Sequence, residues 1–315
     1  MAVQTGSFTT YAAKGNREDL TNIIYNISPA DTPALSAFGK GKATAVLHEW
    51  QTDTLASAST TNAVEEGYVF PGTTSSPTTR VQNYCQISAK DVVISGSQQA
   101  VLHAGRDDEM AYQMAKRSKE LKTDMEATLT RTQGQAAGDA STARKARALE
   151  SWLSTNTNRA TNGANATAAT AAPTDGTQRN FTEALLKDVL QKVYTAGGEA
   201  SMIMTGPANK ANLSSFTGRA SARQNVSANT ILGAASLYSS DWGDLRVVPN
   251  RQQRDRSVFV LSPDYAAVSY LRPFQTVDLA KVGDAEAKGL IVEWTLEMRN
   301  EAAHGVVADL TTTVN

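Results

Sequence analysis

A single long helix constrains the fold of this chain more than any other segment. The run 107–132, DDEMAYQMAKRSKELKTDMEATLTRT, begins with acidic residues and repeats its apolar residues at helical spacing. At about 1.5 Å per residue it predicts a helix of roughly 40 Å, which is longer than most helices of globular proteins. We therefore expect a central element to which the other parts of the chain attach.

The residues before this helix divide into a predicted arm and a predicted protruding hairpin. The first 42 residues offer only short helical pieces, one at 16–27 and another that begins at Thr32 and Pro33. From Ala43 to Ser95, two strand-like flanks enclose a middle rich in Gly, Ser and Thr. A long hairpin that is polar on both sides buries little within its own chain. We expect it to reach out to a partner.

The residues after the helix contain an insertion, a mixed region and a late strand. Residues 156–180 are low in complexity and have no periodic apolar face, which predicts a surface insertion. From Phe181 to about Pro263, helical and strand-like patterns alternate. A long, half-buried strand is predicted at 290–299, because apolar residues fall on one of its sides and polar residues on the other. The apolar side consists of Leu290, Val292, Trp294, Leu296 and Met298.

The same late strand offers a set of groups from which a hydrolase could be built. Its polar side carries Glu293, Glu297 and Arg299, and Glu301 and His304 follow. Residues two apart on a strand are roughly 7 Å apart, so these groups form a row and do not converge on one point. We interpret the row as solvated or facing a partner, and His304 as an ordinary surface histidine in a turn.

Composition argues against several other classes of site. The formal net charge is −1, so no broad cationic field drives strong binding to nucleic acid. One cysteine and three histidines exclude an internal disulfide and leave little for a metal site, and we expect no cofactor. No segment approaches a membrane span and no signal peptide is evident, so we expect no membrane contact and synthesis in a cytoplasm.

Five stretches, taken together, give the chain a family resemblance. In order they are SPADTPALSAFGKGKA, NYCQISAKDVVISGSQQAV, YTAGGEASMIMTGPANKANLSSF, DWGDLRVVPNR and LRPFQTVDLAKVGDAEAKGLIVEWTLEMRNEAAHG. Their order and spacing resemble the major capsid proteins of tailed bacteriophages, specifically the SU-ten-like capsid family. The resemblance runs through nearly the whole chain and leaves out only the insertion.

The resemblance implies the Hong Kong 97-like major capsid fold, an α+β architecture. It implies an N-terminal arm at 1–42, an extended loop at 43–95, a peripheral domain at 96–180 with its spine helix at 107–132 and the insertion at 156–180, an axial domain at 181–263, and a return to the peripheral domain at 264–315 with the strand 290–299.

The implied function is that of a major capsid protein of a tailed double-stranded DNA bacteriophage. Copies of the chain would form the hexamers and pentamers of an icosahedral shell around the genome, and no reaction would be catalysed. The implied partners are further copies, a portal, a scaffold, a cement protein and, by weak local contacts, the packaged DNA. The chain would be made in the host cytoplasm and located in the virion.

Two sets of residues are expected to make these contacts. Arg144, Lys145 and Arg147 are candidates for DNA or scaffold, although basic clusters this short are usually solvated faces. Contacts between subunits are expected at Asp31, Thr32, Pro33, Glu65, Glu66, Phe70, Arg80, Glu293, Glu297, Arg299 and Glu301. Two alternatives remain open: an encapsulin-like nanocompartment shell of the same fold, and a hydrolase that uses Glu293, Glu297 or His304.

Overall fold

The structure is a computed structural model that describes residues 31–314 except 71, 73, 74, 76, 104, 106 and 217–235. The helix predicted at 16–27 lies outside the described residues. In chain order, the elements are α1 (Pro33–Ala37), β1 (Gly39–Lys42), β2 (Leu47–Thr52), β3 (Thr79–Tyr84), β4 (Gln86–Ser95), α2 (Gly96–Ala100), α3 (Glu109–Leu129), α4 (Leu149–Trp152), β5 (Thr157–Asn158), α5 (Glu183–Thr195), β6 (Met202–Thr205), α6 (Pro207–Ser214), β7 (Leu237–Ser240), β8 (Gly243–Pro249), β9 (Val258–Leu261), β10 (Ala266–Asp278), β11 (Ala285–Met298) and β12 (Gly305–Val307), with short 3-10 turns at Pro263–Tyr265 and Glu301–Ala303.

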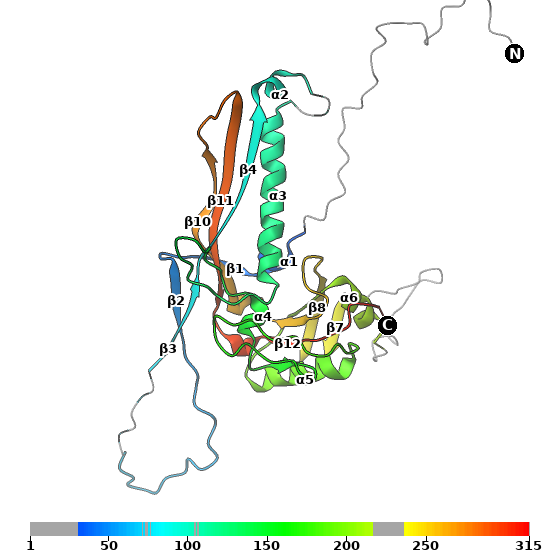
Figure 1. Cartoon of the computed structure of the whole chain (residues 1–315). Coiled ribbons are helices and arrows are strands. Elements are labelled where there is room, and N and C mark those ends of the chain that lie inside the picture. Colours follow the sequence, from blue (N-terminus) through cyan, green and yellow to red (C-terminus); the bar gives the residue numbers. More distant parts are fainter. Residues whose placement is uncertain are drawn as a thin grey trace, which may run out of the picture.

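The predicted long helix is present as α3, and it runs along the sheet that carries β4 and β11 (Figure 1). Its start is fixed by Asp108, whose side chain accepts hydrogen bonds from the backbone amides of Met110 and Ala111. Its methionines and leucines recur four or seven positions apart and are buried, with Met114 half-buried, which keeps one face of the helix on the sheet. No helix among the described residues is long and apolar enough to cross a membrane.

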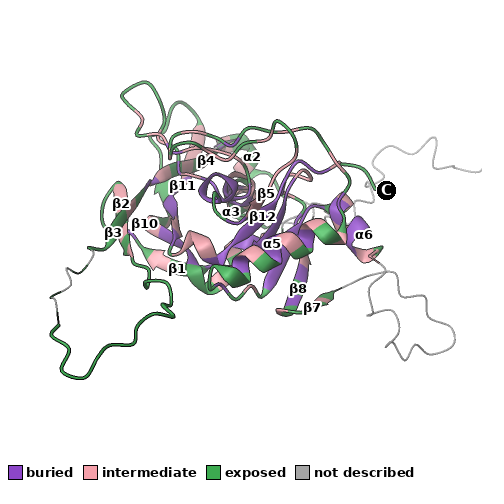
Figure 2. Ribbon diagram, turned by 90° about the horizontal axis from the view of Figure 1, so that it is seen from below, coloured by how far each residue is buried: buried purple, intermediate pink, exposed green. Residues whose placement is uncertain are grey.

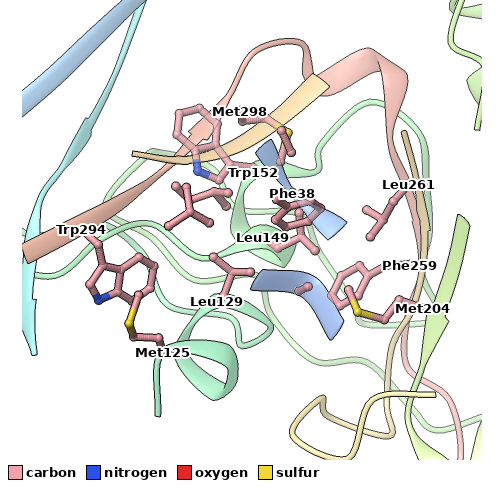
Figure 3. Packing of buried hydrophobic residues seen from close by; sticks show 14 of the residues in the cluster. Phe38, Met125, Leu129, Leu149, Trp152, Met204, Phe259, Leu261, Trp294 and Met298 are labelled. Carbon is pink, nitrogen blue, oxygen red and sulfur yellow. The ribbon is translucent and has the colours of Figure 1, made fainter. Parts of the chain in front are cut away.

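A four-stranded sheet in the order β1-β10-β11-β4 forms the layer beside α3. β10 and β11 are antiparallel, with Ala266 opposite Met298, and β4 pairs antiparallel with the other edge of β11. The predicted strand at 290–299 is therefore the second half of a longer strand. Its apolar side is buried as predicted, and Trp294 lies close to Met125 of α3 in the core (Figure 3).

The second flank of the predicted hairpin divides at Cys85. β3 pairs antiparallel with β2, whereas β4 leaves the hairpin and joins β11 in the four-stranded sheet. The prediction of one hairpin over 43–95 is therefore wrong beyond Tyr84. The physical reason is burial, because Val92 and Ile94 of β4 pack against Met110 of α3.

A second, six-stranded sheet has the order β5-β12-β9-β6-β8-β7. The helix α5 lies across it, and the apolar side of α5 is buried at Leu186, Val189, Leu190 and Val193 (Figure 2). Two of its strands, β5 and β12, lie in the ranges 96–180 and 264–315, which the sequence analysis assigned to the peripheral domain together with the long helix. The predicted boundaries at 180 and 263 therefore do not separate the two sheets, since β5 and β12 are paired through Val306 and Thr157.

One core joins the two layers. It combines Leu129 and Trp294 from the α3 side with Met204 and Phe259 from the six-stranded sheet (Figure 3). Because the core is continuous, the α3 layer and the six-stranded sheet are fixed relative to one another.

The predicted insertion at 156–180 has little regular structure but is fastened to the body by polar contacts. The buried carboxylate of Asp309 accepts hydrogen bonds from the backbone amides of Ala160 and Gly176, and Arg159 forms an ion pair with the buried Glu150 at 3.2 Å. A side chain at Gly163 would collide with Asp309, so a glycine is required at this close approach.

Candidate assembly surfaces

The loop between β2 and β3 exposes more large apolar side chains than any other loop of the described chain. β2 and β3 pair from Leu47 opposite Tyr84 as far as Thr52 opposite Thr79, and the described residues of the loop 53–78 continue away from the body (Figure 1). Leu55 is 98% exposed, Val69 82% and Phe70 88%. A cluster of this kind marks an interaction surface.

The predicted contact residues Glu65, Glu66 and Phe70 all lie in this loop and are exposed. The rings of Tyr68 and Phe70 meet edge to face with centroids 5.7 Å apart. Arg80 lies on β3 and is also exposed, with Glu49 at 3.7 Å. The Arg80–Glu49 pair is weak, because its atoms are far apart and both side chains are exposed. Arg80 can therefore pair with a carboxylate of a partner.

The base of the hairpin is fastened to the end of β11. The indole Nε1 of Trp50 donates to the carbonyl of Met298 at 2.8 Å. Asn83 is fully buried, and its Nδ2 donates to the carbonyl of Leu296 at 2.8 Å while its Oδ1 accepts from the amide of Arg147. These contacts set the direction in which the loop leaves the body.

Glu293 is buried and paired within the chain. One of its oxygens accepts from Arg144 Nη2 at 2.7 Å, and the other accepts from Arg272 Nε at 2.8 Å. The prediction of a solvated or partner-facing row is therefore wrong for Glu293, and Thr295 on the same side of β11 is buried as well. The reason is that residues around Arg144, far away in sequence, cover this side of β11.

Glu297 lies in a second polar cluster on the same side of β11. Its Oε2 accepts from Ser269 Oγ at 2.6 Å and lies 3.1 Å from His48 Nε2, and its Oε1 accepts from Arg299 Nε at 3.1 Å. Burial raises the pKa of Glu297, but these three hydrogen bonds outweigh burial and lower it. Sequence reasoning brought Glu297 and Arg299 together but missed His48 and Ser269, which carry no local signal.

The Glu297 cluster does not have the arrangement of a hydrolytic site. Ser269 and His48 both contact the same carboxylate oxygen, so the hydroxyl donates to Glu297 and is not hydrogen-bonded to any imidazole of the described residues. Glu301 is engaged elsewhere: its carboxylate accepts from the amides of Ser154 and Thr155 at 2.7 and 2.8 Å. The row therefore fastens separate segments of the chain to β11.

His304 is buried, so the prediction of a surface histidine is wrong. Its Nδ1 accepts from the amide of Ser262 at 3.2 Å, and Asn156 donates to its carbonyl. Burial lowers the pKa of His304 to about 4, against a smaller opposing effect of a hydrogen bond to the backbone of Tyr265. The imidazole is therefore neutral at neutral pH.

This buried imidazole predicts a loss of stability in acid. Between pH 6.5 and about pH 4 the unfolded chain binds a proton at His304 that the folded chain does not, so the free energy of unfolding falls as the pH falls through this window. The full effect is on the order of 3 kcal/mol. We expect urea titrations of the unassembled chain to show it, and His304→Asn, whose Oδ1 replaces Nδ1, to have a shallower slope. Equal slopes for the two proteins would show that His304 is not the source of the pH dependence. The raised pKa of Glu126 changes the stability in the opposite direction, but this contribution is the same in both proteins.

The basic cluster Arg144, Lys145 and Arg147 does not form a group of three free bases. Arg144 forms an ion pair with the buried Glu293. The guanidinium of Arg147 stacks on Trp152 at 4.3 Å and donates to the carbonyl of Ser151, and burial lowers the pKa of Arg147. Lys145 alone among the three is exposed.

The short helix α1 is held by a buried carboxylate on α3. The amides of Ala34 and Leu35 donate to the two oxygens of Glu126 at 2.7 and 2.9 Å, and Asn250 Nδ2 donates to Glu126 Oε1 at 2.6 Å. Burial raises the pKa of Glu126, although these hydrogen bonds oppose the change. Glu126 therefore joins α1, α3 and the turn after β8 at one point.

The remaining predicted contact residues lie beside this junction. Asp31 is exposed, Thr32 precedes α1 and makes no side-chain capping bond, and Pro33 is the first residue of α1. Sequence reasoning missed Glu126, because an acidic residue in a charged helix is usually exposed.

The described residues contain no group of three or more His, Cys, Asp or Glu side chains placed to hold a metal ion. Cys85 is buried, and burial, assisted by Glu293 and opposed by Arg144, raises its pKa to about 11. The thiolate is therefore disfavoured at neutral pH. A hollow of about 390 Å³ lies beside Arg144 and is lined by Ile87, Ala137, Gly138, Asp139, Thr142 and Ala143.

Several known proteins that are similar to this chain are capsid or encapsulin proteins. The major capsid protein of Escherichia phage Phieco32 is 29% identical over 340 residues, which cover 95% of this chain and 96% of that protein. The capsid of a native GTA particle shares the fold with a TM-score of 0.66 at 10% identity, covering 96% of this chain and 98% of that chain. The SrpI encapsulin of Synechococcus elongatus, solved as a holo complex, is also similar, with a TM-score of 0.55 at 10% identity, covering 95% and 94%.

The comparison also confirms the resemblance found in the sequence. A model of the SU10 major capsid protein family matches residues 4–311, which include both sheets, the loop 53–78 and the insertion. Because this match spans nearly the whole chain, the chain belongs to the SU10 major capsid protein family.

Proposed function

We propose that this phage major capsid protein assembles with copies of itself into the hexamers and pentamers of an icosahedral shell that encloses double-stranded DNA, without catalysing a reaction. The observation that supports this proposal best is the loop 53–78, which exposes large apolar side chains beyond a hairpin whose base is fixed to β11. A single copy gains nothing from such a loop, whereas a neighbouring copy can cover it.

The parts of the chain take these roles in the proposal. Residues 1–42 are the N-terminal arm, and Glu126 fixes its last helix, α1. The extended loop runs from 43 to 84, since β4 belongs to the four-stranded sheet. The helix α3 is the spine helix of the peripheral domain, and the six-stranded sheet, including β5 and β12, forms the axial domain.

Assembly would be driven by many modest contacts. Burying an exposed Leu, Val or Phe side chain contributes about 1.5–3 kcal/mol, and each copy offers several in the loop. Because every copy both donates a loop and receives one, these contacts add through multivalency. Glu65, Glu66, Phe70 and Arg80 remain the proposed loop contacts, and Asp31, Thr32 and Pro33 those of the arm.

Other contacts follow from this role in the virion. A portal, a scaffold and a cement protein would bind the shell, and synthesis would take place in the host cytoplasm. Among the late-strand residues proposed as contacts, Arg299 is the most exposed. Glu293 is no longer proposed as a contact, because it is buried within the chain.

The test is the size of the particles that the chain forms. We expect the full-length chain, produced alone and concentrated stepwise, to give closed particles or rings of five and six in sedimentation and negative-stain microscopy. A chain that stays monomeric with and without a co-produced scaffold contradicts the proposal. Particles from infected cells that hold an enzyme in place of DNA would assign the shell to a nanocompartment.

A further inference from the structure

Three exposed lysines lie on the outward face of α3 and on its flank beside β10. Lys116, Lys119 and Lys122 are exposed, and none of them forms an ion pair with a carboxylate of the described residues. They are three residues apart, so they span about 9 Å along the helix and 120° around it. Lys122 also lies over the ring of Phe274 at 5.8 Å, which places this end of the row beside β10.

Two more lysines lie on the same side of the four-stranded sheet. Lys40 and Lys42 of β1 are exposed, and the register places them beside Val268 and Tyr270 of β10. Val268 belongs to the core on the α3 side, so the side chains of Lys40 and Lys42 point to that side as well. Two elements that are far apart in sequence therefore contribute cations on the α3 side of the sheet.

The carboxylates on the middle of α3 do not neutralise this face. Glu120 is paired with Arg117 at 2.7 Å and interacts with Lys116 only at longer range, and Asp124 is paired with Lys90 at 2.8 Å. The face is therefore positive although the chain as a whole has a formal charge of −1. Such a local field attracts an anionic partner.

The chemistry of the face favours a polyphosphate over a protein. A protein partner needs an apolar centre in its interface. The exposed large hydrophobic side chains of the described chain lie elsewhere, and none of them is on α3 or β1. Lysine is a mobile point charge that suits phosphates without fixed spacing, and a DNA duplex presents a charge about every 1.7 Å along its axis.

We propose that Lys116, Lys119 and Lys122, with Lys40 and Lys42, bind the phosphate backbone of packaged duplex DNA, so that the outward face of α3 lines the inside of the shell. This inference rests on the proposed capsid function and replaces the cluster at Arg144, Lys145 and Arg147 as the main DNA contact. The contact is sequence-independent because it is made to phosphates and not to bases. It is also sensitive to salt, since each neutralised phosphate contributes about 0.9 to the slope of log K against log salt concentration.

The first experiment measures binding of the unassembled full chain to a short duplex by fluorescence anisotropy over a range of salt concentrations. We expect K116Q/K119Q/K122Q to lower the slope by about 2–3, because three phosphate contacts are lost. The matched control K145Q/R246Q/R251Q removes the same charge from other exposed positions and is expected to keep the slope. Equal loss in both variants, or a slope near zero for the unchanged protein, overturns the proposal. Thermal unfolding checks that both variants are folded.

The second experiment locates the face in the particle by acylating lysines in DNA-filled and emptied shells. We expect Lys116, Lys119 and Lys122 to be protected only in filled shells. Equal labelling in both states, or labelling by a bulky reagent from outside, overturns the proposal. Protection in DNA-free particles that contain a scaffold, without protection in filled ones, assigns the face to an acidic protein and also overturns it. If no particles form, the proposed capsid function is wrong. The anisotropy experiment does not depend on particles, so it tests the DNA contact separately.

Discussion

Replacing Glu126 by alanine is expected to lower the free energy of unfolding of the unassembled chain by about 2–6 kcal/mol. The amide of Ala34 and the side chain of Asn250 are fully buried; the amide loses its acceptor in the variant, and Asn250 Nδ2 keeps only the weak acceptor Met204 Sδ at 3.4 Å. A buried donor left without an acceptor costs about 1–3 kcal/mol. Urea unfolding followed by circular dichroism measures the change, which we expect as a lower midpoint at an unchanged m-value.

Glu120→Ala is the matched control for this substitution. Glu120 lies on the same helix but is partly exposed and paired only with Arg117 at 2.7 Å, so its removal is expected to cost less than about 1 kcal/mol. Trypsin adds a second measurement, because Lys40 and Lys42 follow α1 directly and are expected to be cut faster when α1 loses its anchor. A Glu126→Ala variant as stable as Glu120→Ala rules out Glu126 as the anchor of α1.

The elements that sequence patterns predicted well are those whose burial is periodic. The long helix and the apolar side of β11 follow from spacing alone, because one neighbour, the sheet or the helix, buries the whole stripe. The late strand was predicted as half-buried, yet Glu293 and Thr295 are buried as well. Glu293 is paired with Arg144 from a distant segment of the chain, and no pattern within β11 predicts that pairing.

The candidate surfaces show the same division. Phe70, Glu65 and Glu66 were predicted as exposed contacts because a hairpin that is polar on both sides has no internal place to bury them, and the structure leaves them exposed. Glu126 was missed, and His304 was wrongly predicted to be at the surface, because their partners, at Ala34 and Ser262, are distant in sequence. A buried polar group is determined by those partners, which a single sequence does not reveal.

The register of the hairpin allows the extended loop to be removed without disturbing its base. Thr52 and Thr79 are the last paired residues of β2 and β3. Replacing residues 53–78 by Asn-Gly closes the two strands with a two-residue type I′ turn, which matches the twist of antiparallel strands. The anchoring contacts of Trp50 to Met298 and of Asn83 to Leu296 are retained.

This shortened chain is expected to fold as stably as the full chain and to form no closed particles. Stability is retained because the loop makes few contacts with the body, and assembly is lost because the exposed side chains that a neighbour covers are gone. Thermal unfolding of the unassembled chains and sedimentation under assembly conditions measure the two properties separately. A milder variant, Phe70→Ala with Val69→Ala, is expected to raise the concentration at which particles appear at least tenfold, since about 1.4 kcal/mol per contact changes an equilibrium constant tenfold. Particles of normal size and yield from the shortened chain would move the main assembly contact from the extended loop to another surface.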